Sequence, residues 1–178
     1  MIVRAARADD AEALAAIYAH HVDHGVGTFE EIAPSAGEMA DRLAAVQARG
    51  LPWMVVERDG QVKAFTYAAP FRLRAAYRYT AEDSVYVAPD AQRQGHGRAA
   101  LGAVIQACEA LGLRQIVAVI GDSANHGSIG LHRALGFEPA GLLPAAGFKL
   151  GRWVDVVLMT RALNGGGVGE PVGAGLDI

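Results

Sequence analysis

Apolar residues recur along the chain with two spacings, one typical of helices and one typical of strands. Helical spacing of three and four residues predicts helices over residues 10–24, 36–49, 98–111 and 125–135. Short apolar runs predict strands at residues 2–5, 53–58, 62–69, 80–87, 116–120, 137–150 and 153–160. The predicted order is β-α-α-β-β-β-α-β-α-β-β, an α/β (α+β) fold in which a mixed sheet has helices on both faces.

Capping and turn residues mark the ends of several of these elements. Asp9 or Asp10 can cap the first helix, and Ser35 with Glu38 matches a capping box before the second. Asp59-Gly60 between two extended runs is a strong hairpin signal. Residues 1–163 are therefore expected to form one domain. The glycine-rich residues 164–178 are expected to be a flexible tail.

The composition is that of an ordinary globular chain, with 52% hydrophobic residues, 20% charged residues and a formal net charge of −3. No basic stripe is visible, so a nucleic-acid partner is not expected. No apolar run approaches the length of a membrane span, and charges near the N-terminus argue against a signal peptide. Cys108 is the single cysteine, which excludes an intrachain disulfide and suits the cytoplasm. It is more readily a small buried hydrophobe than a nucleophile.

The histidines of the first helix suggest a metal site only weakly. His20 and His24 lie one helical turn apart, but His21 stands where a zinc-protease pattern has glutamate. No third ligand is evident, so a polar helix face is expected and no metal.

A glycine-rich loop at residues 92–97, Gln-Arg-Gln-Gly-His-Gly, follows one predicted strand and precedes a predicted helix. Exposed amide groups and the positive end of the helix dipole make such a loop an anion site. The loop lacks the Gly-Lys-Ser/Thr of a Walker A motif and the third glycine of a dinucleotide fingerprint. A different phosphate-bearing ligand is therefore expected.

Four stretches together resemble the GNAT N-acetyltransferases. Gln92, Gly95 and Gly97 match the pattern Gln/Arg-x-x-Gly-x-Gly/Ala, and residues 125–137 are similar to the second coenzyme segment of that family. Residues 82–87 resemble the strand that lines the acetyl site. Residues 146–156 resemble the last hairpin of the phosphinothricin and methionine sulfone/sulfoximine acetyltransferases. The resemblance covers residues 1–162.

This resemblance implies a GNAT-like fold with acetyl-coenzyme A as co-substrate and no metal. The residues from Arg93 to Arg98 would hold the pyrophosphate, and the amide of Val87 would lie nearest the thioester carbonyl. The residues expected to bind the coenzyme are Val85, Tyr86, Val87, Arg93, Gln94, Gly95, His96, Gly97, Arg98, Asn125 and Ser128. For Asn125, a plain helix N-cap is an equally good interpretation.

Glu82 is the expected general base. In an ideal strand Glu82, Ser84 and Tyr86 share one face, and burial there would raise the pKa of Glu82 toward the working pH. Asp83 on the opposite face is the better match for a solvent-exposed acid, although a bulge would exchange the two. His132 is expected either to protonate the departing thiolate or, with slightly more weight, to position another group.

The implied amine substrate is a small amino acid. Phe29 and Glu30 resemble the substrate loop of the branch, and Arg72 and Arg78 can clamp a carboxylate, a sulfone or a phosphinate. Acetylation of a protein N-terminus or a lysine is the alternative activity, and an acyl-coenzyme A sensor is the alternative from another class. The resemblance also implies a homodimer, with the hairpin of Trp153 as a candidate contact.

Overall fold

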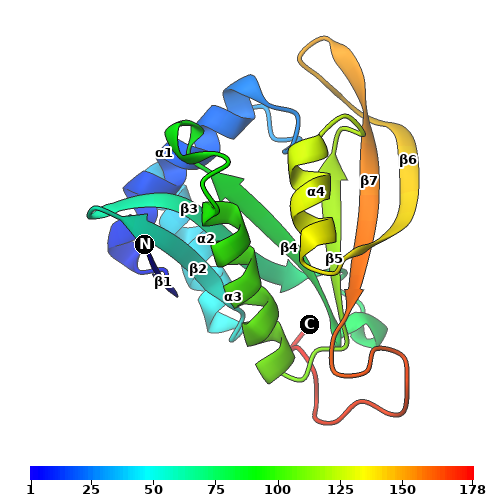
Figure 1. Cartoon of the computed structure of the whole chain (residues 1–178). Helices are drawn as coiled ribbons and strands as arrows, with labels where there is room; N and C mark the ends of the chain where they lie inside the picture. Colours follow the sequence, from blue (N-terminus) through cyan, green and yellow to red (C-terminus); the bar gives the residue numbers. More distant parts are fainter.

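The computed structural model describes residues 1–178 and shows a seven-stranded sheet between two pairs of helices (Figure 1). The helices and strands follow in the predicted order, which is confirmed. They are β1 (Ile2–Ala5), α1 (Ala11–His24), α2 (Ala36–Ala48), β2 (Trp53–Arg58), β3 (Gln61–Pro70), β4 (Thr80–Val87), α3 (His96–Ala110), β5 (Gln115–Gly121), α4 (His126–Ala134), β6 (Glu138–Lys149) and β7 (Arg152–Ala162).

The sheet contains a single parallel pair of strands. The strand order is β1-β2-β3-β4-β5-β7-β6, and only β4 and β5 run in the same direction, joined by the crossover helix α3. Their pairing ends at Asp83 and Ala118, whereas β5 continues beside β7 as far as Gly121. The two strands diverge beyond Asp83, so the edge of β4 from Ser84 onward has no strand partner on that side. We call the space between the diverging strands the wedge.

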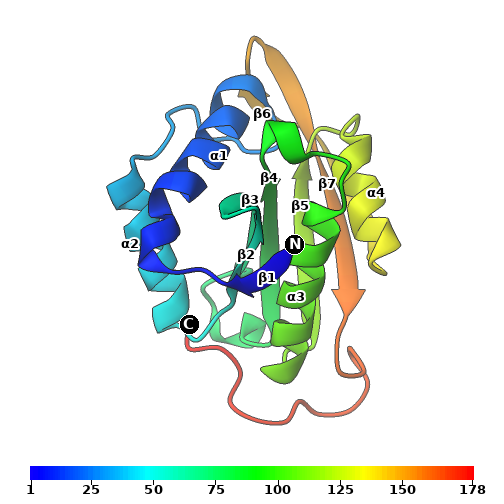
Figure 2. The ribbon, with the colours of Figure 1, turned by 60° about the vertical axis from the view of Figure 1, so that its left-hand side comes forward.

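Two separate apolar clusters cover the two faces of the sheet. Figure 2 shows α1 and α2 on one side of the sheet and α3 and α4 on the other. Leu14, Met39 and Phe65 belong to the cluster under α1 and α2. Leu101 and Ile116 belong to the cluster under α3, which reaches β5 and β7. Because successive side chains of a strand point to opposite faces, β3 contributes to both clusters, with Phe65 in one and Ala68 in the other.

The predicted caps and turns are largely confirmed. Ser35 Oγ accepts the Glu38 amide at 3.2 Å while the Glu38 carboxylate accepts the Ser35 amide at 2.7 Å. Asp59 and Gly60 both have positive φ, as a two-residue hairpin turn requires. The cap at Asp10 was wrong, because its carboxylate accepts from Arg4 and from the Arg7 amide instead of capping α1.

Helix α3 starts two residues before the predicted boundary, at His96. The residue before it, Gly95, has a φ of 86°, which favours glycine and lets the loop turn directly into the helix. The turn between the last two strands lies at Leu150 and Gly151, one residue before the expected position.

The glycine-rich tail contains no helix or strand and runs beneath the sheet from β7 toward α2 (Figures 1 and 2). It contacts the domain at several points. Arg114 Nε donates to the Gly166 carbonyl and the Leu176 amide donates to the Arg78 carbonyl, both at 2.7 Å. The Leu176 side chain packs against the cluster under α3. The flexibility of the tail stays a prediction. None of the helices has the length and apolar character that crossing a membrane requires.

Candidate active site

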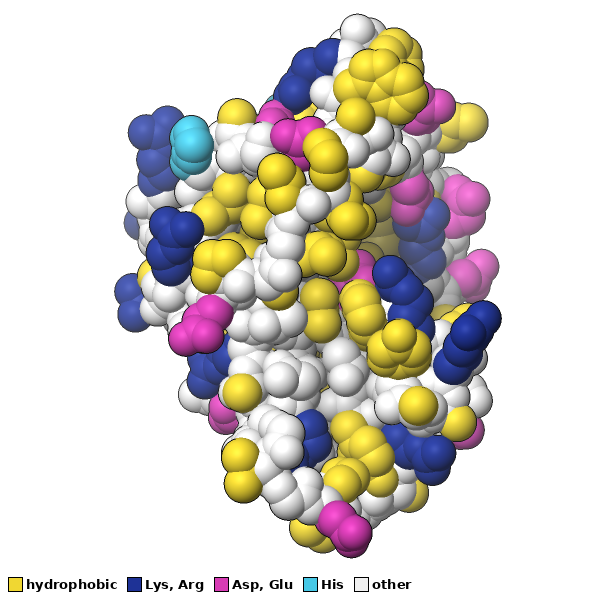
Figure 3. Space-filling view, turned by 90° about the vertical axis from the view of Figure 1, so that its right-hand side faces the viewer, with side chains coloured by type: hydrophobic (Ala, Val, Ile, Leu, Met, Phe, Trp, Pro, Cys, Tyr) yellow, Lys and Arg dark blue, Asp and Glu magenta, His cyan; other side chains and the backbone are white.

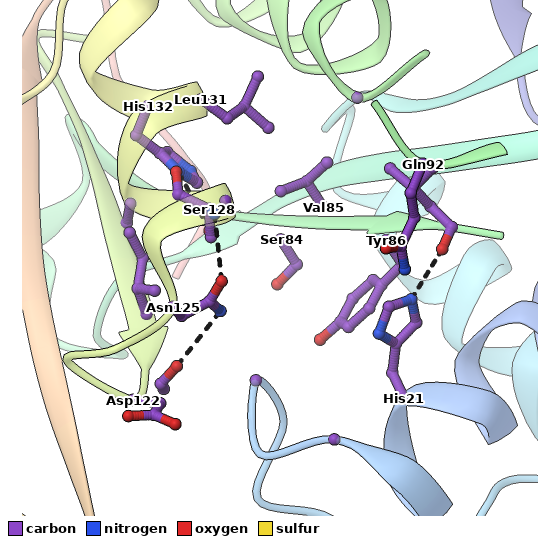
Figure 4. Close-up of a pocket in the computed structure, with 18 of the residues that line it drawn as sticks. His21, Ser84, Val85, Tyr86, Gln92, Asp122, Asn125, Ser128, Leu131 and His132 are labelled. Atoms are coloured by element: carbon purple, nitrogen blue, oxygen red, sulfur yellow. Dashed lines mark hydrogen bonds between the residues drawn. The ribbon is translucent and has the colours of Figure 1, made fainter. Parts of the chain in front are cut away.

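A cavity of about 810 Å³ occupies the wedge between β4 and β5 (Figure 4). Its walls come from the end of α1, the open edge of β4, the loop before α3 and the first turns of α4. Of the residues expected to bind the coenzyme, the structure brings ten to this cavity, together with His132. They are Val85, Tyr86, Val87, Arg93, Gly95, His96, Gly97, Arg98, Asn125 and Ser128.

The glycine-rich loop supplies the end of the cavity at which α3 begins. A Cβ atom on Gly97 would lie 3.2 Å from Val87 Cγ2 and 3.3 Å from Leu131 Cδ2, so the helix start packs directly on β4. The first amide groups of α3 have no partner inside the helix, and the helix dipole is positive there. The loop therefore has the geometry of an anion site.

Two residues of this loop have side chains that bond within the protein. The amide of the Gln94 side chain bonds to Arg58 and to the Asp90 carbonyl oxygen. The His96 ring is buried and its Nδ1 lies 3.0 Å from the Ala91 carbonyl oxygen. Gln94 does not line the cavity, and the side chain of His96 fixes the loop from behind.

The first turn of α4 forms the opposite wall of the cavity. Asn125 Oδ1 accepts the Ser128 amide at 3.1 Å, which confirms the N-cap interpretation, and its Nδ2 donates to the Gly121 carbonyl at 3.3 Å. In Figure 4 the side chains of Asn125 and Ser128 face the open edge of β4 across the cavity. A contact of Asn125 with a coenzyme stays a prediction.

The alternation expected along β4 is present and no bulge interrupts it. The pairing with β3 runs without a shift from Val87 opposite Ala64 to Ala81 opposite Pro70. Tyr86 packs edge-on against Tyr18 of α1, so the face that it shares with Glu82 is the face of α1 and α2. Burial raises the pKa of Glu82, the charge of Arg72 opposes this rise, and Asp83 adds to it. Glu82 does not line the wedge cavity.

The surroundings of Asp83 differ most clearly from those expected from the sequence. It is not a solvent-exposed acid: it is 5% exposed and accepts a hydrogen bond of 2.9 Å from Nε2 of His132. The second ring nitrogen, Nδ1, lies 2.8 Å from the Ser128 carbonyl oxygen. Burial disfavours a charged ring, but the hydrogen bond and the charge of Asp83 outweigh it and raise the pKa of His132.

The loop after α1 is fixed by contacts with β5 and β6. A Cβ on Gly121 would collide with the Val26 carbonyl, and one on Gly147 would collide with the ring of Phe29. The ammonium of Lys149, a buried residue, donates to the Thr28 carbonyl at 2.9 Å. The loop can lie this close to β5 and β6 because the residues that face it, Gly121 and Gly147, have no side chains.

The carboxylate of Glu30 is already engaged within the protein. It forms an ion pair of 2.7 Å with Arg42 and accepts a hydrogen bond of 2.9 Å from the Tyr18 hydroxyl. Arg42 lowers the pKa of Glu30, which therefore stays ionised. These bonds give Glu30 a role in the shape of the loop, and its predicted contact with substrate stays a prediction.

The two arginines expected to clamp the substrate lie in different surroundings. The guanidinium of Arg72 is 4.2 Å from the centre of the Phe71 ring and close enough to Glu82 to lower its pKa. Arg78 Nε donates to the Ala75 carbonyl, and its side chain faces Gly175 of the tail. Neither arginine lines the wedge cavity. Of the two, Arg72 is the one near the expected base.

His21 of α1 is a site residue that sequence reasoning missed. Its Nε2 donates to the Val87 carbonyl at 2.9 Å, and its ring lies 5.4 Å from that of Tyr86 (Figure 4). Burial lowers the pKa of His21 and favours the neutral ring. His20 and His24 stack on each other at 4.9 Å beside it. The contact between His21 and β4 could not be predicted from helical spacing, because three histidines in one turn resemble a polar helix face.

Comparison with known proteins agrees with this geometry. The model described as "Acetyltransferase (GNAT) family" matches residues 13–137. A phosphinothricin N-acetyltransferase of Alcaligenes faecalis is 53% identical over 164 residues, which cover 92% of this chain and 83% of that relative. An L-methionine sulfoximine/L-methionine sulfone acetyltransferase of Salmonella typhimurium is 35% identical over 92% of this chain and 95% of its own length.

A solved structure extends the comparison to the fold. The crystal structure of a GNAT superfamily phosphinothricin acetyltransferase from Sinorhizobium meliloti in complex with AcCoA superimposes with a TM-score of 0.92 at 44% identity. The match covers 96% of this chain and 92% of that one. The resemblance found in the sequence is confirmed: the chain belongs to the GNAT family of acetyltransferases.

Proposed function

We propose that this protein transfers the acetyl group of acetyl-coenzyme A to the amino group of a small amino-acid-like substrate, of the phosphinothricin, methionine sulfone or methionine sulfoximine kind. The observation that supports this most is the wedge between β4 and β5. It joins an anion site at the start of α3 to an unpaired strand edge. The relatives named above act, by their names, on these same amino-acid analogues.

The residues of the wedge suit acetyl-coenzyme A. The amide groups at residues 95–98 and the Arg98 side chain would hold its diphosphate, and Asn125 and Ser128 face the space left for its pantetheine arm. A Cβ atom on Gly97 would crowd Val87 of β4 at 3.2 Å, and the lack of a side chain there keeps the loop amides open to the ligand. The bound molecule would supply an activated thioester, and the unpaired amides of β4 would stabilise the oxyanion that forms from it.

The amine would enter from the opposite face of β4. Glu82 lies on that face with a pKa raised by burial, which makes it a stronger base that can take a proton from an ammonium and leave a nucleophilic amine. Arg72 beside it is the better supported partner for a substrate carboxylate, sulfone or phosphinate. Phe29, on the loop fixed by Lys149 and Gly147, would close this side of the site.

A thiol-release assay with an amino-acid panel tests the proposal. The wild-type protein should release coenzyme A when phosphinothricin, methionine sulfone or methionine sulfoximine is added, and much less with a peptide N-terminus or a lysine side chain. Release that needs a peptide would favour the protein-acetylating alternative. If acetyl-coenzyme A binds but no amine causes the release of coenzyme A, the protein is an acyl-coenzyme A sensor.

Two glycines of α3 give a matched test of the coenzyme site. Gly97→Val should abolish the binding of acetyl-coenzyme A measured by calorimetry, because its side chain would enter the space between Val87 and Leu131. Gly102→Val places the same residue in the same helix at a position with nothing within 4 Å. It should therefore bind like the wild type. Equal affinities for the two variants would remove the loop from the coenzyme site.

The proposal includes a homodimer built through the last hairpin. Leu142, Leu143, Phe148 and Trp153 are all about half exposed or more, and the rings of Phe148 and Trp153 contact each other at 5.3 Å. Hydrophobic side chains gather on this side of the molecule (Figure 3), and β6 is an edge strand. Trp153→Lys should shift a dimer to a monomer in light scattering. Val168→Lys, at an exposed residue of the tail, should not.

The proposal also places the protein in the cytoplasm, which suits its single, buried and unpaired cysteine, Cys108. Cell fractionation followed by immunodetection tests this location. Recovery of the protein outside the cytoplasmic fraction would reject it.

A further inference from the structure

Three side chains from β4 and α4 are linked at the closed end of the wedge. His132 Nε2 lies 2.9 Å from Asp83 Oδ2. His132 Nδ1 lies 2.8 Å from the Ser128 carbonyl oxygen and 3.4 Å from the Ser128 hydroxyl oxygen. A carboxylate and a carbonyl oxygen can only accept hydrogen bonds, so each ring nitrogen must donate when Asp83 is ionised. The geometry therefore selects a doubly protonated ring.

The charge of Asp83 is compensated by this ring alone. Its second oxygen, Oδ1, is buried and has no hydrogen-bond partner. Both side chains are almost completely buried, at 1% exposure for Asp83 and 2% for His132, and a buried carboxylate needs a partner of opposite charge. The ring of His132 is therefore the counter-charge of the Asp83 carboxylate.

Few other titratable groups face this pair. Cys108 approaches from α3, but burial and the charge of Asp83 raise the pKa of its thiol to about 12, so it stays neutral. Glu82 is next in the chain and points to the opposite face of the sheet, where it interacts with Asp83 only through its charge. From α4 the partner is Ser128, and the uncharged ring of Phe137 packs edge-on against the His132 ring at 4.9 Å.

We propose that Asp83, His132 and Ser128 form a relay that supplies a proton to the sulfur atom of the departing thiolate. This inference rests on the function proposed above. All three residues line the cavity, but the side chains of Asp83 and His132 are almost completely buried, whereas Ser128 is half-buried and carries a hydroxyl (Figure 4). His132 delivers the proton to Ser128. Asp83 is a positioning residue, because it keeps the second proton on Nε2 and fixes the ring.

The step balances in atoms and charge. The amine nitrogen forms a C–N bond to the acetyl carbon, and the C–S bond breaks with its electron pair on sulfur. The sulfur takes the proton of the Ser128 hydroxyl while that oxygen takes the Nδ1 proton of His132. The ring is left neutral, with Nε2–H still donating to Asp83. The nitrogen loses two protons, one from the ammonium before the attack and one as the C–N bond forms. Both leave through Glu82 to solvent, one after the other, and the ring takes one proton from solvent before the next turnover.

Asp83→Asn tests the relay because it keeps the shape of the side chain and removes its charge. The ring then loses its counter-charge, so the alkaline limb of the kcat–pH profile should move at least one pH unit toward acid. The KM for acetyl-coenzyme A should stay within about twofold. The matched control is Asp90→Asn, which removes a surface carboxylate paired with Lys63 and should leave the profile unchanged.

Ser128 is tested by a pair of substitutions. Ser128→Ala should lower kcat by at least about tenfold, since general acid catalysis typically contributes 10²-fold or more and water can replace part of it. Ser128→Thr retains a hydroxyl and should recover most of the rate. A Ser128→Ala enzyme with a wild-type kcat, or an Asp83→Asn profile that superimposes on the wild type, would overturn the relay.

Nitrogen NMR of histidine-labelled wild-type protein provides a measurement that needs no stable Asp83 variant and no turnover. With His132→Gln to assign the signals, both ring nitrogens of His132 should be protonated at pH 6.5, where about half of ordinary histidine rings are neutral. A neutral ring at pH 6.5 would refute the inference. If instead the wild type releases no thiol with any amine, the proposed function fails while the ring state remains measurable by itself.

Discussion

The ammonium group of Lys149 and the carbonyl oxygen of Thr28 meet at 2.9 Å although 121 positions separate them in the chain. This bond ties the last hairpin to the loop after α1. Lys149 is only 3% exposed, and burial lowers its pKa even though Asp23, Glu30 and Glu31 favour its charge. This buried cation thus helps to hold the predicted substrate loop against β6, where Gly147 leaves room for Phe29.

Lys149→Met should loosen this loop and keep most of the apolar side-chain volume. A buried hydrogen bond from a charged group contributes about 1.5–3 kcal/mol, so the KM for the amine should rise about tenfold or more. Steady-state kinetics with acetyl-coenzyme A saturating measures this. Lys63→Met, at a lysine that pairs with Asp90 on the surface, is the control. It should change neither the KM for the amine nor the KM for acetyl-coenzyme A. An unchanged KM for the amine in Lys149→Met would separate the loop from substrate binding.

Glu82 and Arg72 make a joint prediction about pH. A base works only when it is deprotonated, so kcat/KM should fall as the pH drops through the pKa of Glu82, which burial raises above that of an ordinary glutamate. Glu82→Gln should abolish this acid limb and lower kcat by about 10²-fold, the low end for general base catalysis.

Arg72→Ala should move the same limb to higher pH, because the cation that lowers the pKa of Glu82 is removed. Arg78→Ala, at the arginine beside the tail, should leave the limb in place and so serves as the control. If Arg72→Ala leaves the acid limb at the same pH, the limb reports the titration of a group other than Glu82.

The Asp83–His132 pair should also make stability depend on pH. The folded pKa of His132 is raised above its unfolded value, which is about 6.5. The stabilisation is therefore fully present below pH 6.5 and is lost as the pH rises through the folded pKa. Urea unfolding of the wild type and Asp83→Asn, at one protein concentration from pH 5.5 to pH 9, should show a difference in unfolding free energy that shrinks with increasing pH. A constant difference would argue against a protonated ring.

The tail should add a small amount of stability through one residue. Leu176→Ser removes apolar contact with the cluster under α3, at a cost of about 1 kcal/mol, and should lower Tm by about 2–4 °C. Val172→Ser, at an 88% exposed residue of the same segment, should leave Tm unchanged. Amide exchange of Leu176 tests the predicted flexibility at the same time. Full protection of that amide would contradict a flexible tail, and equal Tm values would show that its contacts are transient.

Caps, turns and strand faces that depend only on neighbouring residues could be predicted from the sequence. The side chains of Ser35 and Glu38 bond to each other's backbone amides, and Asp59-Gly60 needs nothing beyond its own backbone angles. The alternation along β4 followed from strand geometry alone and placed Glu82 and Asp83 on opposite faces. The glycines of the loop before α3 indicated an anion site because their effect depends on the adjacent helix, which is also predictable from the sequence.

The contacts that were missed join residues far apart in the chain. Asp83 and His132 are 49 positions apart, and nothing in either segment indicates that α4 places its histidine over the last paired residue of β4. The same holds for His21, whose ring reaches Val87 only because α1 crosses the open end of that strand. Arg78 was assigned from its neighbours in sequence, and the tail that lies against it could not be placed beforehand.

The division of the interior into two apolar clusters has a consequence for engineering. The loop with Phe29 connects α1 to α2 and is bonded to Tyr18 of α1 through Thr28 and Glu30, while Gly97 lies in the first turn of α3. Libraries that diversify the half built by α1 and α2 should broaden the range of amines accepted without eroding use of the acyl donor. Variants that use longer acyl donors would have to be selected from libraries that diversify the half built by α3.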